Sequence, residues 1–254
     1  MEVFRKNNRT NFVSFSGIDG AGKGTQIKAL CTMLEEDGQR VLVIRFWDDV
    51  ARFTRTREET GHRLFKGDRG IGTPALPINR RDKNVKSFLM TGVRLLLYFV
   101  DALSLRVAVQ KALRSDTDLV VFDRYIYDEL ANLPIRNPAI RAYVRVIDGL
   151  VPKPHISYIL DADPVKARER KPEYPLEFLY TNRQSFLDLG DLIGGMTLIA
   201  PMPIEEVKMA VLRNAVERLS FRTLKTKNDK CLVLRADEGQ WSGPDEPESR
   251  PASS

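Results

Sequence analysis

Short apolar runs alternate along this chain with segments whose apolar positions repeat at helical spacing. The runs rich in Val, Ile, Leu and Phe predict β-strands at 11–17, 40–46, 118–125, 156–163 and 196–200. Helical periodicity predicts helices at 23–37, about 84–113, 137–149, 164–170, 175–190 and 204–220. Continuous apolar strands separated by helices are typical of a parallel sheet covered on both faces. The pattern therefore predicts an α/β fold.

The length of 254 residues and an ordinary globular composition, with 43% hydrophobic residues, exclude wholesale disorder. We expect a single domain over residues 1–236. Residues 237–254 hold five acidic residues against one arginine, together with three prolines and four serines. Such a segment cannot bury enough apolar surface to offset its ordering entropy, so we expect a disordered acidic tail.

The net charge of +6 is unevenly distributed. Residues 52–94 contain eleven Lys or Arg against four acidic residues, and we interpret them as a basic insertion that includes a long Gly- and Pro-rich loop. This excess of positive charge favours an anionic partner such as a nucleotide, a nucleic acid or a lipid surface, without choosing among them.

The remaining composition excludes several classes of protein. Two cysteines, Cys31 and Cys231, and two histidines, His62 and His155, do not form a zinc-binding pattern, and we expect reduced thiols. The N-terminus lacks the apolar core of a signal peptide, and the most apolar stretch, 95–100, is too short to span a bilayer. We therefore expect a cytoplasmic protein without a membrane partner.

The strongest chemical signal is GIDGAGKGT at 17–25, between the first strand and the first helix. Gly17, four residues, then Gly22-Lys23 match the first seven positions of the phosphate-binding loop. Glycines let successive N–H groups point at phosphate oxygens, and Lys23 can reach the β- and γ-phosphates. The eighth position is Gly24 rather than Ser or Thr, and Thr25 is positioned to contact phosphate or magnesium. The alternative is a glycine-rich turn without a ligand.

Two further groups of charged residues strengthen this hypothesis. Asp123-Arg124 ends the strand 118–125, where an Asp can hold hydrated magnesium and an Arg can clamp a phosphate. The alternative is an ion pair that caps the strand. RERK at 168–171 lies in a predicted lid region, 164–190, where arginines can neutralise a moving phosphoryl group. The alternative for this run is a solvated face.

These motifs resemble those of the thymidylate kinases, a family of nucleoside monophosphate kinases. The resemblance extends to RLLLYFVDALSLRVAVQKAL, which precedes VVFDRY, and to YILDADPVKARERK, which follows it. The resemblance covers about residues 11–220. It implies a P-loop NTPase-type fold, with a doubly wound, five-stranded parallel sheet of order 2-3-1-4-5 and helices on both faces. It also implies ATP and Mg²⁺ as cofactors, and it is compatible with a homodimer.

The resemblance assigns roles on the ATP side of the site. The loop would hold the ATP phosphates through Gly17, Asp19, Gly20, Ala21, Gly22, Lys23, Gly24 and Thr25. Lys23, Asp123, Arg168 and Arg170 would be catalytic. One subgroup of the family carries a catalytic Arg at the position of Gly20, so here the lid arginines should supply it. Magnesium would lie at Thr25 and Asp123, and the loop at 200–204 would lie beside adenine.

On the acceptor side, the resemblance places Asp19 at the acceptor sugar, Arg45 at the acceptor phosphate and Arg124 near magnesium and the phosphates. Tyr98 is a further candidate for binding the acceptor. The groups that read thymine depart from the family: Arg45 is followed by Phe46-Trp47-Asp48 instead of Glu-Pro-Gly, and Asp101 is not followed by Arg. Phe46, Trp47 or Tyr98 can stack on a base, although core packing is the simpler interpretation of each.

Three hypotheses follow. The first is ATP-dependent transfer of a phosphoryl group to a nucleoside monophosphate, by a dTMP kinase or a related enzyme. The second is a kinase of a nucleoside or another small acceptor on the same scaffold. The third is a non-catalytic regulator that binds nucleotides or polyanions and uses Arg80 and Arg81. Nucleic acid is disfavoured as a partner, because the basic segment lacks interleaved aromatic residues.

Overall fold

A computed structural model describes residues 10–51 and 88–219 of the chain, and a parallel sheet forms its centre. The strands are β1 (Asn11–Ser16), β2 (Val41–Arg45), β3 (Leu119–Asp123), β4 (Ile156–Leu160) and β5 (Thr197–Ile199). Their order is β2-β3-β1-β4-β5, and every pair is parallel. The expected fold class and strand order are confirmed.

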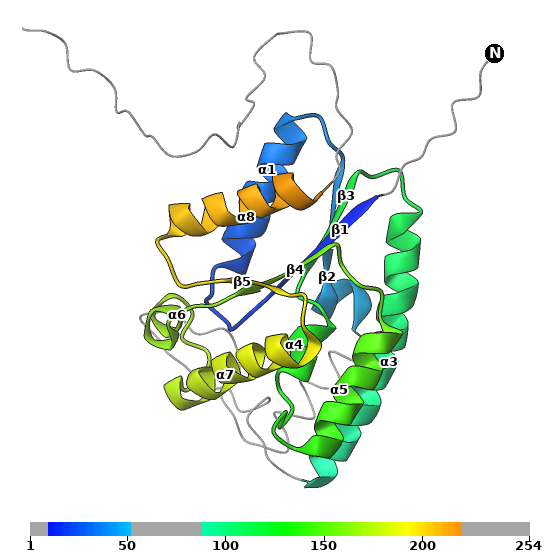
Figure 1. Ribbon diagram of the computed structural model, residues 1–254, viewed down its shortest axis with the longest axis vertical. Coiled ribbons are helices and arrows are strands. Elements are labelled where there is room, and N and C mark those ends of the chain that lie inside the picture. Colours follow the sequence, from blue (N-terminus) through cyan, green and yellow to red (C-terminus); the bar gives the residue numbers. More distant parts are fainter. Residues whose placement is uncertain (1–9, 52–87, 220–254) are drawn as a thin grey trace, which may run out of the picture. The chain divides into compact units, whose positions relative to one another are not determined.

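Helices cover both faces of this sheet (Figure 1). On one face α1 (Lys23–Glu36) and α8 (Ile204–Arg218) pack over β1, β3 and β4. The opposite face is covered by α3 (Phe88–Leu113), α5 (Pro138–Leu150) and α7 (Leu176–Ile193). The described part of the chain contains no helix with the length and apolar character needed to cross a bilayer.

The alternation of side chains along β1 explains why both faces need a cover. Phe12 belongs to the core under α3, α5 and α7, whereas Val13 and Phe15 belong to the core under α1 and α8. All six residues of β1 are buried. β1 itself includes the buried polar residues Asn11, Ser14 and Ser16, whereas β3 and β4 are closer to the continuous apolar run expected of a strand buried on both faces.

The structure adds two short elements that periodicity did not predict. A single π-helical turn, η1 (Phe46–Val50), follows β2, and a helix of five residues, α4 (Ile126–Leu130), follows β3. All five residues of α4 are buried, so no polar face marks it in the sequence. Both elements lie where parallel strands end, and they therefore contribute to the site described below.

A helix of seven residues, α6 (Pro164–Arg170), begins where predicted. The Asp163 side chain accepts hydrogen bonds from the backbone N–H groups of Val165 and Lys166, and Pro164 fills the first helical position. This combination is a strong signal for a helix start. It fixes where the chain leaves β4 and enters the predicted lid.

The chain divides into two units, Met1–Thr223 and Leu224–Ser254, and every described residue belongs to the first. Most of the basic insertion (52–87), including Arg80 and Arg81, lies outside the described residues, as do the acidic tail, His62 and Cys231. The domain boundary at residue 236 and the disordered tail therefore stay predictions.

Candidate active site

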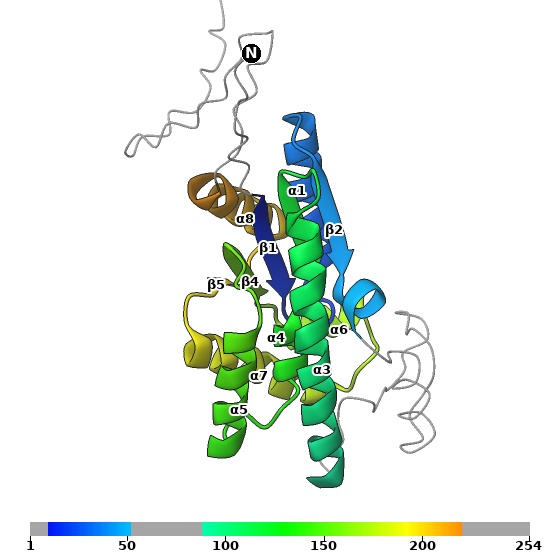
Figure 2. The same ribbon diagram turned by 90° about the vertical axis from the view of Figure 1, so that its right-hand side faces the viewer.

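The phosphate-binding loop connects β1 to α1 at the carboxyl edge of the sheet. In Figure 2 the arrowheads of β1 and β2 point the same way, toward α4 and α6. Backbone φ angles are positive at Gly17, Gly20 and Gly22. A β-carbon on Gly20 would collide with the backbone carbonyl of Ala167 in α6, and one on Gly17 with the carbonyl of Leu160. The glycines therefore allow α6 and the end of β4 to lie directly on the loop.

Lys23 is the first residue of α1, and its side chain turns back into the loop. Its Nζ donates hydrogen bonds to the carbonyls of Gly17 at 2.6 Å and Ile18 at 3.0 Å. The residue is only 7% exposed. This geometry places an ammonium group at the centre of the ring of backbone that would surround a phosphate.

Burial, followed by the charge of Arg124, lowers the pKa of Lys23 to about 8, while Asp128, Asp19 and Asp123 act to raise it. The protonation of the Lys23 ammonium therefore depends on one nearby cation and three nearby carboxylates. An added phosphate oxygen would favour the charged form of Lys23 in the same way as these carboxylates do.

The start of α1 completes the loop. The Gly22 carbonyl accepts hydrogen bonds from the N–H groups of Thr25 at 3.1 Å and Gln26 at 3.2 Å. Gly24 and Thr25 are both exposed. The N-terminus of a helix carries a partial positive charge and outward N–H groups, so this end of α1 favours an anion.

The end of β3 brings two predicted residues to the same edge. Asp123 is in register with Phe15 of β1 on one side and with Arg45 of β2 on the other. Arg124 follows in a left-handed conformation, with φ of 70°, which is uncommon for a residue other than glycine. Strained backbone of this kind is concentrated at functional sites, and here it sets the direction of the Arg124 side chain.

The Arg124 guanidinium is held between two carboxylates. It donates a hydrogen bond to Asp19 of the phosphate loop, and its Nη1 lies 3.7 Å from Oδ1 of Asp128. Burial acts to lower the pKa of Arg124, but Asp19 and Asp128 raise it above its ordinary value. Arg124 therefore stays charged and connects β3 to the loop.

Asp128 in α4 is a member of this group that the sequence did not single out. It is 4% exposed, and its Oδ2 accepts a hydrogen bond of 3.3 Å from the backbone N–H of Tyr125. Burial raises its pKa, against the opposing charges of Lys23 and Arg124. The only sign of Asp128 in the sequence is that an acidic residue follows Asp123 by five positions. Because the sequence does not predict the short helix α4, it does not indicate that Asp128 lies near Lys23 and Arg124.

The lid helix α6 lies against the loop. A β-carbon built on Gly22 would lie 3.9 Å from Nη1 of Arg170. Lys171, just beyond the helix, places its Nζ 3.8 Å from Oδ1 of Asp19 and 3.2 Å from Oε1 of Glu173. Arg168 lies in the same helix. The structure therefore brings Arg170 and Lys171 to the loop, although Lys171 was not assigned a role from the sequence.

Two residues predicted to bind the acceptor, Arg45 and Tyr98, lie on β2 and α3, and η1 directly follows β2. Arg45 is exposed at the end of β2, and its backbone N–H donates to Asp49 at 2.8 Å. Phe46 is fully buried in the core, and Trp47 packs edge-on against it at 5.7 Å between ring centroids. Tyr98 on α3 is also a core residue, with 5% exposure. Phe46 thus packs in the core, whereas a role for Tyr98 in binding the acceptor stays a prediction.

The residues present fit a magnesium ion bound mainly through phosphate. The described residues contain no group of three or more His, Cys, Asp or Glu that could hold a metal ion by themselves. Mg²⁺ in phosphoryl-transfer sites instead uses one or two protein oxygens and several from phosphates and water. Asp123 is close enough to raise the pKa of Lys23, and Thr25 is exposed at the start of α1. Both are suitable oxygen donors.

Comparison with known proteins finds several thymidylate kinases among the relatives of this chain. No model of a protein family matches the chain. It is 28% identical over 224 residues to a probable thymidylate kinase of Archaeoglobus fulgidus, which covers 85% of this chain and 99% of the relative. It is 28% identical over 223 residues to that of Pyrobaculum calidifontis, covering 82% and 98%. A stretch of 37 residues is 57% identical to a thymidylate kinase of Bradyrhizobium, covering 15% of this chain and 16% of the relative.

Solved structures of thymidylate kinases share the fold of this chain. The TM-score is 0.52 with a thymidylate kinase from Ehrlichia chaffeensis, at 19% identity, covering 80% of this chain and 97% of that one. It is 0.54 with the enzyme from Candida albicans, at 18% identity, covering 82% and 92%. The resemblance drawn from the sequence motifs is thereby confirmed.

Proposed function

We propose that this chain, which is similar to thymidylate kinases over most of its length, transfers a phosphoryl group from ATP to a nucleoside monophosphate. dTMP is the first acceptor to test. The observation that carries the proposal is the buried Lys23 ammonium, held on the carbonyls of Gly17 and Ile18 beneath the lid helix. A cation enclosed by a glycine loop at a helix N-terminus is suited to the β- and γ-phosphates of a nucleotide.

On the ATP side, the backbone of residues 17–25 would cradle the phosphates. Lys23, with Arg170 and Arg168 of α6, would neutralise the charge that develops on the moving phosphoryl group. Thr25 and Asp123 would hold Mg²⁺, which supplies positive charge to the phosphate oxygens. Gly20 supports the assignment to lid arginines, because α6 lies on it and leaves no room for a side chain there.

On the acceptor side, Arg45 would bind the phosphate of the acceptor and Asp19 its sugar, with Arg124 and Tyr98 nearby. An oxygen of the acceptor phosphate forms the new bond to the γ-phosphorus as the bond to the bridging oxygen of ADP breaks. Because that oxygen is already an anion, no strong base is needed, and the catalysis consists of positioning and charge neutralisation. The cationic groups near the loop, Lys23 and the arginines of α6, are consistent with such a mechanism.

A homodimer is a further part of the proposal, and it rests on α3. This helix presents an apolar stripe of residues that are 39% to 66% exposed: Val93, Leu96, Phe99, Leu103 and Val107. Their spacing of three or four residues places them on one side of the helix. Leu96→Glu should convert a dimer to a monomer in light scattering, whereas a wild-type chain that is already monomeric would contradict this part.

The activity is tested with a panel of ribo- and deoxyribonucleoside monophosphates and free nucleosides, each with ATP and magnesium. Lys23→Ala should reduce transfer about a hundredfold or more, with an unchanged circular dichroism spectrum. Lys28→Ala is the matched control, because Lys28 is an exposed lysine of the same helix. Wild-type rates in Lys23→Ala would refute the proposal. Turnover only with a nucleoside would favour the second hypothesis, and no turnover with any acceptor would favour a non-catalytic nucleotide-binding protein.

A further inference from the structure

A bidentate ion pair near the predicted lid region has no role in the site described above. Arg183, in the middle of α7, donates from Nε to Oδ1 of Asp161 at 2.6 Å and from Nη2 to Oδ2 at 2.7 Å. The Asp161 side chain is 7% exposed and that of Arg183 is 34% exposed. A bidentate pair fixes the relative orientation of two groups more strictly than a single contact does.

The pair joins a residue just before the predicted lid region, Asp161, to a residue within it, Arg183. Asp161 is the first residue after β4, and its N–H donates to the Ile199 carbonyl of β5 at 2.9 Å, which anchors it to the sheet. Arg183 is anchored because α7 packs into the core through Phe186 and Leu189. Between them the chain forms α6, a loop and the first turns of α7, so the ion pair sets where this segment starts and returns.

Part of the lid segment packs on itself, although Ala167 of α6 belongs to the main core. Tyr174, Phe178 and Leu179 form a separate small apolar cluster, with the rings of Tyr174 and Phe178 4.9 Å apart. A segment that packs partly on itself can shift when the contacts that orient it are weakened. Its position relative to the phosphate loop then depends on the connections at residues 161 and 183.

We infer that Arg183 and Asp161 are a positioning pair that holds the lid helix at its contact distance from the phosphate loop. The inference rests on the proposed function, because it concerns the placement of Arg170 and Lys171 over the loop. Neither member of the pair touches Gly20 or Gly22; each acts through α6, whose Ala167 carbonyl lies against Gly20. A displacement of about 1 Å in such a group can reduce a rate by as much as a hundredfold.

The test uses Arg183→Gln, Asp161→Asn and the double variant in the full chain. Each single variant should lower kcat at least tenfold, with a smaller change in KM for ATP, and the double variant should be no slower than the worse single variant. Amide hydrogen exchange in residues 164–171 should be about tenfold faster in all three, while amides of β1 and β3 keep their protection.

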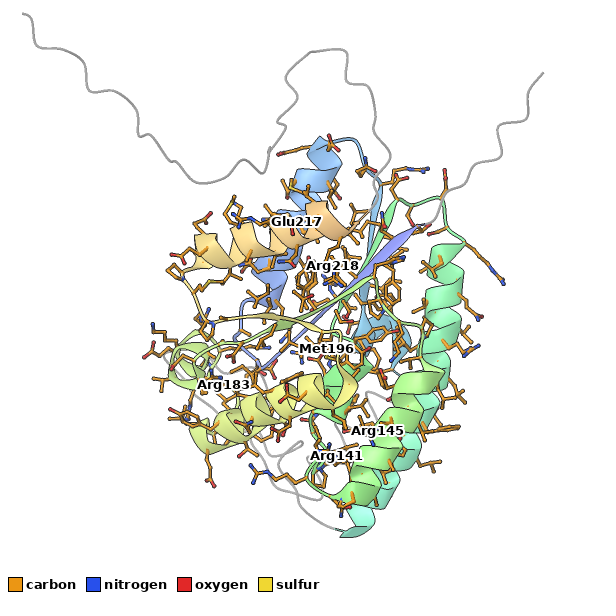
Figure 3. The ribbon with its side chains drawn as sticks, viewed as in Figure 1. Arg141, Arg145, Arg183, Met196, Glu217 and Arg218 are labelled. Carbon is orange, nitrogen blue, oxygen red and sulfur yellow. The ribbon has the colours of Figure 1, made fainter. Side chains whose placement is uncertain are left out.

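Arg218→Gln is the matched control, because Arg218 of α8 donates to Thr197 Oγ1 of β5 at 2.7 Å but reaches the sheet from the opposite face (Figure 3). It should leave both kcat and exchange in α6 unchanged. Unchanged exchange in α6 of the Arg183 and Asp161 variants, or single effects that multiply in the double variant, would overturn the inference. If the wild-type chain turns over no acceptor, the proposed function fails, and the exchange experiment still decides whether the pair holds the lid.

Discussion

The proposed ATP side and the proposed acceptor side of this site are built in different ways. On the ATP side the groups are mainly backbone: three glycines with positive φ, the N-terminus of α1, and the carbonyl of Ala167 against Gly20. On the acceptor side they are side chains of β2, η1 and α3, such as Arg45, Phe46 and Tyr98. The backbone cradle leaves no room for a side chain at Gly17 or Gly20, whereas on the other side Arg45 is exposed and Phe46 is buried in the core.

The largest effect is expected from the backbone cradle. Gly20→Ala should reduce kcat about a hundredfold, because the added β-carbon displaces α6. The left-handed conformation of Gly20 adds a cost to stability of about 1 kcal/mol. Steady-state kinetics and thermal unfolding measure both effects.

Gly149→Ala is the control for Gly20→Ala. A β-carbon on Gly149, in α5, meets no atom within 4 Å, and alanine should stabilise the helix by about 0.5–1 kcal/mol. Full activity in Gly20→Ala would show that the loop and lid are less tightly packed than the structure describes, and the contrast between the two sides would disappear.

The next effect separates core packing from base recognition on the acceptor side. Phe46→Ala should lower the free energy of unfolding by about 3–5 kcal/mol, because Phe46 is completely buried. Trp47→Ala should cost less stability, since Trp47 is only partly buried. Denaturant unfolding measures the stability of each variant. A Phe46→Ala protein of unchanged stability but raised KM for the acceptor would instead assign Phe46 to the base.

A smaller effect is expected at Arg45. Arg45→Ala should raise KM for the acceptor about ten- to hundredfold, because one charge-assisted contact to its phosphate is lost. KM for ATP should change less than about twofold, because the phosphate loop is intact. Kinetics with each substrate varied in turn provide the measurement. Equal changes in both constants would show that the two sides are not independent.

The smallest effect concerns Asp128, which joins the two sides. Asp128→Asn should reduce kcat about tenfold, because Arg124 loses one of its two carboxylate partners. The same change should increase the stability at pH 7, because burial raises the pKa of this acid in the folded state.

The gain in stability that we expect from Asp128→Asn depends on pH. An acid whose pKa is raised by folding destabilises the protein once the pH exceeds its pKa in the unfolded chain, and it costs nothing at lower pH, where both states are protonated. The gain in Asp128→Asn should therefore be largest at neutral pH and vanish below about pH 4. Urea unfolding at several pH values tests this. A variant that is less stable at pH 7 would mean that the contacts of Asp128 with Lys23 and Arg124 outweigh its burial.

The sequence located the elements around the glycine loop almost completely. The strand before the glycines, the helix after them, Asp123-Arg124 and the Asp163-Pro164 start of α6 all have local signals that depend only on neighbouring residues. The acceptor side carried fewer signals. Neither η1 nor α4 is long enough for periodicity, and the burial of Phe46 or Asp128 results from elements distant in the chain.

By itself, the sequence determined the order of strands and helices and the identity of the phosphate loop, because apolar periodicity and glycine spacing are local properties. Only the tertiary structure decided which charges meet. Asp19, Arg124 and Asp128 converge because β1 and β3 are adjacent and end at the same edge. Asp161 and Arg183 meet because α7 returns across the end of β4. Such pairings depend on the folded path of the chain, and no spacing in the sequence encodes them.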